Sequence, residues 1–101
     1  MKVYLSGVIS LGGILGPEAI AKNLQIFRDA EQVLASQGHV PLNPGSIDGQ
    51  PDWHWRDWMK PALAMLLSAE AIALLPGWEQ SPGARLEWEV ARQLDYPVVT
   101  P

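Results

Sequence analysis

The sequence predicts a single α/β domain, built from a small parallel sheet of about four strands with helices on both faces. Its 101 residues and 48% hydrophobic content suit one compact core and leave no room for a second, so the expected domain spans residues 1–101. Short β-prone segments alternate with helix-prone ones in the order βαβαβαβ, which is typical of a parallel sheet. Residues 71–75 form a continuous apolar run, as in a strand buried on both faces.

The first half of the chain predicts two strands and one long helix. A strand is expected over residues 2–6, followed by a glycine-rich stretch at residues 7–16. Pro17 then occupies the first helical position, which proline prefers, and the helix is expected to reach about Gln37. Apolar residues recur through it at three- and four-residue spacing: Ile20, Leu24, Phe27, Ala30, Val33 and Leu34. A second strand is expected at residues 39–42.

The second half predicts two more helices, each followed by a strand or a strand-like segment. The first helix is expected over residues 53–68, where Pro61 predicts a kink or a division into two short helices near Met59. The apolar strand described above follows it. The last helix is expected over residues 82–94, and residues 97–100 supply a fourth strand.

Ligands of open parallel sheets bind beyond the carboxyl ends of the strands. The loops expected to form the site are therefore residues 7–16, 43–52 and 76–83. The first of these is rich in glycine, and its free N–H groups would suit a phosphate. It matches neither a dinucleotide G-x-G-x-x-G pattern nor a P-loop, so a flexible surface turn explains it equally well.

Charge and composition narrow the range of partners. The formal net charge of -4 gives no basic field for a phosphate backbone, so a nucleic-acid polymer is not an expected partner. The chain has no cysteine, and His39 and His54 lack partners at metal-ligand spacing, so no metal is expected. No signal-peptide pattern and no membrane-spanning apolar run are present, which predicts a cytoplasmic protein that does not enter a membrane.

The most informative single feature is a carboxylate on an apolar helix face. Ser81-Pro82 predicts the start of the last helix, with the Ser81 side chain as its N-cap. At about 100° per residue, Glu87 falls roughly 20° from Leu94, inside the apolar arc. The members of that arc are Leu86, Val90, Ala91 and Leu94. Because burying an unpaired ionised carboxylate is costly, this position needs an explanation.

The pattern alone leaves two explanations of Glu87 open. In the structural one, the positive end of the helix dipole or a basic side chain compensates the charge. In the functional one, Glu87 is a nucleophile or a base in a cleft at the strand ends, where partial desolvation tunes a carboxylate for chemistry.

Tryptophans and aspartates near the expected loops are weaker candidates. Four of the five tryptophans lie in or beside these loops: Trp53, Trp55, Trp58 and Trp78. Such side chains stack on a planar ligand or anchor a core or a subunit interface, and Trp78 is the one favoured for ligand contact. A loose acidic group precedes and enters the second helix: Asp48, Asp52 and Asp57. Solvated loop and cap roles suit it best, although one member can approach Glu87 in space.

Several blocks of residues together resemble the nucleoside 2-deoxyribosyltransferase superfamily. They cover nearly the whole chain: Lys2-Val3-Tyr4-Leu5-Ser6-Gly7, Asn23 with Phe27, Gly38-His39, Asn43-Pro44, Leu74-Leu75-Pro76-Gly77-Trp78 and Ser81-x-Gly83-Ala84-x-x-Glu87. Within it, the chain is similar to short members of the DUF4406 type, carried by phages and bacteria. The resemblance implies a flavodoxin- or Rossmann-like sheet and makes Glu87 the group that attacks the anomeric carbon of a (deoxy)ribosyl group. The base is expelled, and water or a second base then resolves the glycosyl ester.

The resemblance also implies roles for other residues. Tyr4 would be catalytic, because it would orient Glu87 or the sugar. With Trp78 included, the expected substrate-binding residues are Ser6, Gly7, Trp78, Ser81 and Gly83. Ser81 and Gly83 would offer hydroxyl and N–H groups to a sugar or a 5′-phosphate. No metal or organic cofactor is implied, and a homo-oligomer is expected because relatives complete their sites with residues of a neighbouring subunit.

The sequence departs from the family pattern at several positions. Ala62 stands where the family usually has an aspartate that assists at the leaving base, so Asp57, Glu79 or a neighbouring subunit would have to substitute. Val8 replaces a common proline and Glu70 a common aspartate. The first loop also lacks the arginine that some nucleotide hydrolases of the group use on phosphate.

Three functional hypotheses follow. The leading one is an N-glycosidic enzyme that hydrolyses or transfers the base of a (deoxy)nucleoside or its 5′-monophosphate, with Glu87 as nucleophile. The alternative is a non-catalytic nucleotide-binding module that has lost turnover, which Ala62 would permit. A third is a protein-interaction domain that uses the tryptophan-rich helix.

Overall fold

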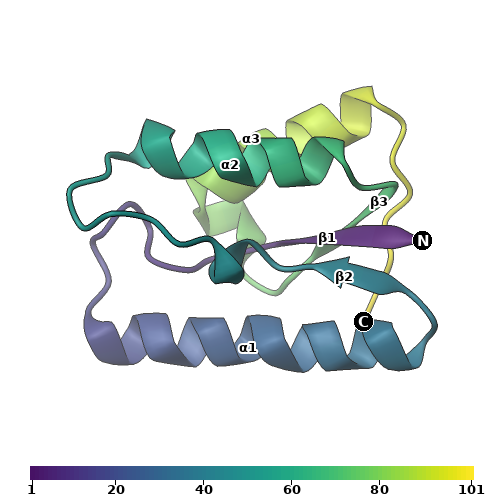
Figure 1. The fold of residues 1–101 in the computed structure, drawn as a ribbon, viewed down its shortest axis with the longest axis horizontal. Coiled ribbons are helices and arrows are strands. Elements are labelled where there is room, and N and C mark those ends of the chain that lie inside the picture. The colour runs from purple at the N-terminus through teal and green to yellow at the C-terminus, as the bar shows by residue number, and fades with distance from the viewer.

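The computed structural model describes residues 1–101 and contains one parallel sheet (Figure 1). The strands are β1 (Lys2–Ser6), β2 (Val40–Leu42) and β3 (Ala71–Leu74), in the order β2-β1-β3. The predicted α/β class is therefore confirmed, and β1 is the central strand, hydrogen-bonded on both sides.

The expected fourth strand is not formed, so the sheet has three strands rather than four. Residues 97–100 contribute a single parallel bridge between Ile72 and Val98. Two hydrogen bonds hold it, from Ile72 N to Pro97 O at 3.1 Å and from Val99 N to Ile72 O at 2.9 Å. Pro97 and Pro101 have no N–H to donate, so neither end of this segment can extend the ladder by a further donated hydrogen bond.

Helices cover both faces of the sheet, as predicted. In Figure 1, α1 (Pro17–Ser36) lies below the sheet, whereas α2 (Trp55–Leu67) and α3 (Pro82–Gln93) lie above it. The α2 helix runs through Pro61 without dividing in two, so the expectation of two short helices was wrong. Proline removes only the hydrogen bond to the carbonyl four residues before it, and packing of the apolar face holds the helix together across that gap. None of these helices has the length and apolar character that a membrane span needs.

Each face of the sheet has its own core. Toward α1, the buried residues are Val3, Leu5, Phe27, Ala30, Leu34, Ala71, Ala73 and Leu75. Toward α2 and α3, they are Tyr4, Leu66, Ala69, Ile72 and Ala91. Successive residues of a strand point to opposite faces, which is why β1 contributes to both cores.

The parallel arrangement brings three loops to one end of the molecule. The carboxyl ends of β1 and β2 point to the left in Figure 1, where the long segments that follow these strands lie close together. The segment after β3 leads through a short turn of 3-10 helix, η2 (Trp78–Gln80), into α3. This end of the sheet is therefore the place to look for a site.

Candidate functional site

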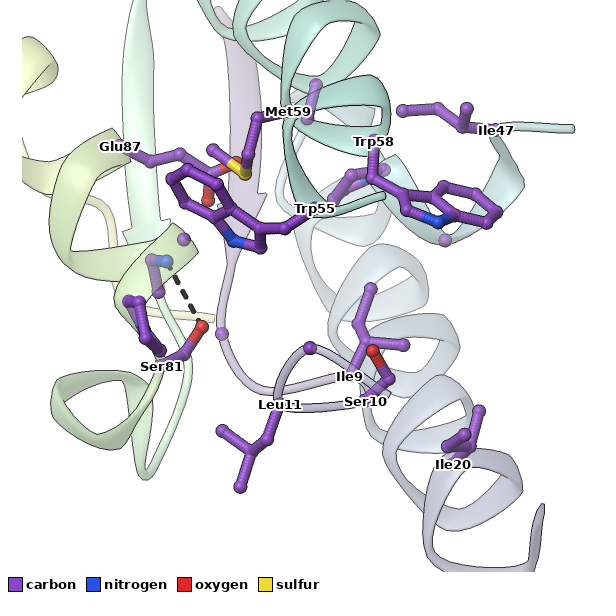
Figure 2. Close-up of a pocket in the computed structure, with 18 of the residues that line it drawn as sticks. Ile9, Ser10, Leu11, Ile20, Ile47, Trp55, Trp58, Met59, Ser81 and Glu87 are labelled. Atoms are coloured by element: carbon purple, nitrogen blue, oxygen red, sulfur yellow. Dashed lines mark hydrogen bonds between the residues drawn. The ribbon is translucent and has the colours of Figure 1, made fainter. Parts of the chain in front are cut away.

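A cavity of about 610 Å³ opens at the carboxyl ends of the strands (Figure 2). All three of the expected loops contribute to its wall, together with parts of α1, α2 and α3. The lining side chains include Tyr4, Gly7, Ile9, Leu11, Ile20, Ile47, Trp55, Trp58, Met59, Ala62, Ser81, Gly83 and Glu87. The rule that ligands bind beyond the strand ends thus locates a real concavity in this chain.

Glu87 lies in the wall of this cavity and is 6% exposed. Both of its carboxylate oxygens accept a hydrogen bond from a buried hydroxyl group. The Tyr4 hydroxyl donates to Oε2 at 2.5 Å, and the Ser6 hydroxyl donates to Oε1 at 2.7 Å. No cationic side chain pairs with it, because the one salt bridge of the chain joins Arg92 to Glu89. Hydroxyl groups, and not a counter-charge, therefore hold this carboxylate.

The β1 backbone explains how the two hydroxyls reach one carboxylate. Tyr4 and Ser6 are two residues apart, so they point to the same face of the strand, toward α3. Both are fully buried, and α3 packs directly on this face. Glu87 lies beyond the first turn of α3, where the helix dipole has little effect. Neither form of the structural explanation, dipole or basic partner, accounts for its burial.

Burial sets the acidity of these groups. Desolvation raises the pKa of Glu87 above its ordinary value, and the hydrogen bonds from Tyr4 and Ser6 oppose that rise. The pKa of Tyr4 is raised strongly, first by burial and then by the adjacent Glu87 charge and their hydrogen bond. Tyr4 therefore remains a protonated donor, and Glu87 is the titrating member of the pair.

The start of α3 has the cap that the sequence predicts. Ser81 Oγ accepts a hydrogen bond from Ala84 N at 3.2 Å, and Pro82 occupies the first helical position. Gly83 allows close packing against α2, since a Cβ there would lie 3.1 Å from Met59 Sδ and 3.6 Å from Trp55 Nε1. A side chain at this position would force the Met59 side chain, which lines the cavity, to shift.

The buried face of α3 differs in part from the predicted arc. Ala91 is fully buried, but Leu86 is 37% exposed and Leu94 is 50% exposed. Small residues and Glu87 form the buried stripe instead: Gly83, Ala84, Glu87 and Ala91. Small side chains let the helix axis approach the sheet closely, which turns the two large leucines outward. Glu87 is therefore at the centre of the buried stripe and not at its edge.

Trp78, one of the residues expected to bind substrate, is not among the residues that line this cavity. It lies in η2 and packs edge-on against Trp88, with ring centroids 6.2 Å apart. The tryptophans that do line the cavity are Trp55 and Trp58 of α2 (Figure 2). The spacing of Trp55, Met59 and Ala62 places them on one face of that helix. This periodicity is the sequence signal from which they could have been predicted to line the cavity.

No second acid lines the cavity. Ala62 is part of the wall, at the position where the family pattern has an aspartate. Asp57 instead accepts a hydrogen bond from the backbone N–H of His54 at 3.0 Å, at the start of α2. Glu79 is exposed and lies outside the wall. No cluster of three or more His, Asp or Glu side chains is arranged to hold a metal ion.

The fold is that of the nucleoside 2-deoxyribosyltransferases. The chain is similar to a solved 2-deoxyribosyltransferase from the psychrotolerant bacterium Bacillus psychrosaccharolyticus, with a TM-score of 0.68 and 20% sequence identity. The match covers 99% of this chain and 71% of that one, which is described as a biocatalyst for the synthesis of antiviral and antitumoral nucleosides. A comparison with curated proteins found no match.

The family is given by the sequence match. Residues 1–100 match the family described as domain of unknown function (DUF4406), and the chain belongs to it. Membership extends over nearly every residue, so the elements that build the cavity all lie inside the family domain. The predicted family is confirmed.

Proposed function

We propose that this protein is an enzyme that cleaves the N-glycosidic bond of a (deoxy)nucleoside or nucleoside 5′-monophosphate, with Glu87 as nucleophile. The observation that carries the proposal is the environment of Glu87. It is a buried carboxylate without a counter-charge, held by the hydroxyls of Tyr4 and Ser6 in the wall of a cavity. Burying a carboxylate without a counter-charge lowers the free energy of unfolding. A reaction that requires this carboxylate explains why it is buried there. The likeness of fold to a 2-deoxyribosyltransferase supports the same class of chemistry.

The proposed reaction has two displacements. A Glu87 oxygen forms a bond to the anomeric carbon while the bond from that carbon to the base nitrogen breaks, and the electron pair leaves with the base. The product is a glycosyl ester of Glu87. Water or a second base then attacks the same carbon, and the carboxylate is released. Its negative charge also stabilises the cationic sugar that develops between the two steps.

Tyr4 and Ser6 act in this scheme as positioning residues. Their hydroxyls fix the plane of the carboxylate, so that its approach to the anomeric carbon does not depend on a free side-chain rotation. Both hydrogen bonds favour the charged form of Glu87, which is the nucleophilic form. Burial opposes them, and activity should therefore increase with pH as Glu87 ionises.

The test combines turnover with covalent trapping. Deoxynucleosides, ribonucleosides and their 5′-monophosphates are incubated with the protein, with and without an acceptor base, and free or exchanged base is measured by chromatography. A 2-deoxy-2-fluoro sugar analogue, which slows resolution of the ester, should add mass to the peptide that contains Glu87. Glu87→Gln should abolish both results, while Glu89→Gln, two residues away and exposed, should retain them.

The alternative is a nucleotide-binding module without turnover, and Ala62 in the cavity wall favours it. The same panel separates the two. The binding module would be supported if calorimetry detects binding of a nucleoside or nucleotide while no substrate releases its base and Glu87 is not labelled. That result would exclude the enzyme hypothesis.

Assembly and location remain predictions. We expect a homo-oligomer in the cytoplasm, and light scattering of the purified protein tests the first part. A monomer at all concentrations would exclude a site shared between subunits.

A further inference from the structure

The cavity has an unusual distribution of charge. Among its 20 lining residues, Glu87 is the one charged side chain, and none of the others is lysine, arginine or histidine. Most of the remaining wall is aliphatic or aromatic. A carboxylate in such surroundings attracts a cation and repels an anion, since little water is present to screen it.

Two indole rings reinforce this preference. Trp55 and Trp58 of α2 both line the cavity, with exposed fractions of 46% and 40%. In Figure 2 the Trp55 ring points toward Glu87 and Ser81, whereas the Trp58 ring points toward Ile47. The cavity wall holds no cationic side chain that could occupy either ring face, although Trp58 also packs edge-on with Trp53, with ring centroids 4.9 Å apart. The face of an indole carries negative electrostatic potential, so it attracts a flat cation more strongly than a neutral ring of the same size.

The cavity also lacks a group that can protonate a leaving base. Glu87 is needed as the nucleophile, Asp57 is bound to the His54 backbone, and position 62 is alanine. A neutral nucleoside base leaves as an anion unless an acid protonates it. A base that carries a positive charge on its ring leaves as a neutral molecule and needs no proton.

We propose that the preferred substrate of this site is a cationic N-glycoside, in which the (deoxy)ribosyl group is bound to a positively charged heterocycle such as a pyridinium or a 7-alkylated purine. The inference rests on the proposed function, because it assigns a substrate class to the same nucleophile. The positive ring lies against Trp55, whose indole points toward Glu87, and the anomeric carbon faces Glu87.

The reaction balances without an acid. A Glu87 oxygen bonds to the anomeric carbon, the carbon–nitrogen bond breaks, and its electron pair neutralises the ring nitrogen. The neutral heterocycle departs, leaving a neutral glycosyl ester. Water then attacks the anomeric carbon, Glu87 leaves as a carboxylate, and the water proton passes to solvent. The net reaction converts a cationic N-glycoside and water into a neutral heterocycle, a free sugar and a proton.

A 5′-phosphate is disfavoured by the same wall. Ala84 N already donates to Ser81 Oγ, and Pro82 has no N–H, which leaves the Ser81 hydroxyl and the Gly83 N–H as neutral donors at the start of α3. With no cation in the cavity wall, neutral hydroxyl and N–H donors alone would have to offset repulsion between the phosphate and Glu87. The unphosphorylated nucleoside is therefore the expected form.

The first experiment compares turnover of charged and neutral N-glycosides. The cationic probes are 7-methylguanosine, nicotinamide riboside and their 2′-deoxy forms, and the neutral ones are guanosine, inosine and their 2′-deoxy forms. Rates with Glu87→Gln are subtracted, because the cationic compounds also hydrolyse spontaneously. We expect kcat/KM to be greater for the cationic probes by about 100-fold or more, the size of a general-acid contribution that they do not need.

The second experiment measures binding independently of turnover. Calorimetry compares 7-methylguanosine with 7-methyl-7-deazaguanosine, a neutral molecule of nearly the same shape. The cation should bind about tenfold more tightly to the native protein. Trp55→Leu and Glu87→Gln should each reduce that ratio, whereas Trp78→Leu, outside the cavity, should leave it unchanged. Trp55→Phe keeps an aromatic face and should therefore retain most of the affinity ratio. It serves as the control if Trp55→Leu does not fold.

The outcomes separate the two proposals. Equal or faster Glu87-dependent turnover of neutral nucleosides would overturn the substrate class and leave the proposed function intact. An absence of turnover with these probes and with all the nucleosides and 5′-monophosphates that test the proposed function would overturn that function, and the binding ratio would still decide whether the cavity selects a cation. If the native protein binds 7-methylguanosine and 7-methyl-7-deazaguanosine with nearly equal affinity, the inferred preference for a cation is overturned, whether or not turnover is detected.

Discussion

The two faces of strand β1 bury different kinds of side chain. Toward α1, Val3 and Leu5 pack with Leu34 in a cluster that is entirely apolar. Toward α3, Tyr4 and Ser6 are just as deeply buried, but each donates a hydrogen bond to Glu87. One five-residue strand thus supports a wholly apolar core on one side and, on the other, a core that includes a hydrogen-bonded carboxylate.

The difference shows how a small domain can separate stability from function. The apolar core resists unfolding through burial of nonpolar surface. The polar cluster places a carboxylate in the same low-dielectric interior, where its charge is costly and its reactivity is tuned. Because the two sets alternate along β1, a substitution on one face should leave the other face largely unaffected.

The largest effect on stability is expected from the apolar face. Leu34→Ala removes a fully buried side chain of α1 and leaves a cavity, at a cost of about 2–5 kcal/mol in the free energy of unfolding. Urea denaturation measures this loss. Turnover per folded molecule should not change, and a Leu34→Ala protein that is folded but inactive would show that the two faces are coupled.

The next effect is expected on the polar face, and on activity. Tyr4→Phe removes a hydrogen bond to a charged group, worth roughly 1.5–3 kcal/mol. That loss corresponds to a decrease of about 10- to 100-fold in kcat if the bond positions Glu87 for attack. Steady-state kinetics with the best substrate of the panel measures it. Ser6→Ala should act in the same direction, and an unchanged kcat in both variants would exclude a positioning role.

A third prediction concerns the pH dependence of stability. Because burial raises the folded-state pKa of Glu87 above its ordinary value of 4.5, its contribution is favourable below that pH and is lost as pH rises through the folded-state pKa. Glu87→Gln is neutral at every pH. The Tm of Glu87→Gln minus that of the native protein should therefore increase with pH from 4.5 upward and then level off.

Thermal melts of both proteins from acid to neutral pH test this. A difference in Tm that is constant with pH would contradict it. The native protein should also gain activity over the pH range in which it loses stability, since both changes follow ionisation of the same carboxyl group.

The smallest effect is expected from the exposed side of α3. Arg92 pairs with Glu89 at 2.7 Å, and both side chains are exposed to solvent. The pair lowers the pKa of Glu89 mainly through its hydrogen bonds to Arg92. Surface pairs of this kind contribute little to stability and are screened by salt. Glu89→Gln should therefore leave both Tm and turnover nearly unchanged, and a large loss of activity would mean that the site extends to this face.

Local patterns in the sequence were sufficient for most of the architecture. Apolar spacing, the proline starts and the Ser81 cap predicted the three helices to within a few residues, because these signals act over one or two turns. The alternation of elements predicted the parallel sheet, and the residues of the family pattern predicted membership of the DUF4406 family. Glu87 was identified because its helix position conflicted with its charge.

Other features depended on contacts between distant segments. Whether residues 97–100 form a strand depends on the N–H groups that Pro97 and Pro101 lack and on space beside β3. Trp78 and Trp55 have the same intrinsic chemistry, and only packing places one against Trp88 and the other in the cavity. Such placements are the sum of many weak contacts, and no local pattern contains them.

By itself, then, the sequence determined the fold class, the family and the identity of the carboxylate. The tertiary structure alone determined its environment: the hydroxyls of Tyr4 and Ser6, 83 and 81 residues away along the chain, and the absence of a counter-charge around Glu87. The physical reason is the separation along the chain over which the two kinds of interaction act. Helix and strand signals act between neighbours in sequence, whereas desolvation and hydrogen bonding of a buried charge depend on whatever the fold brings next to it.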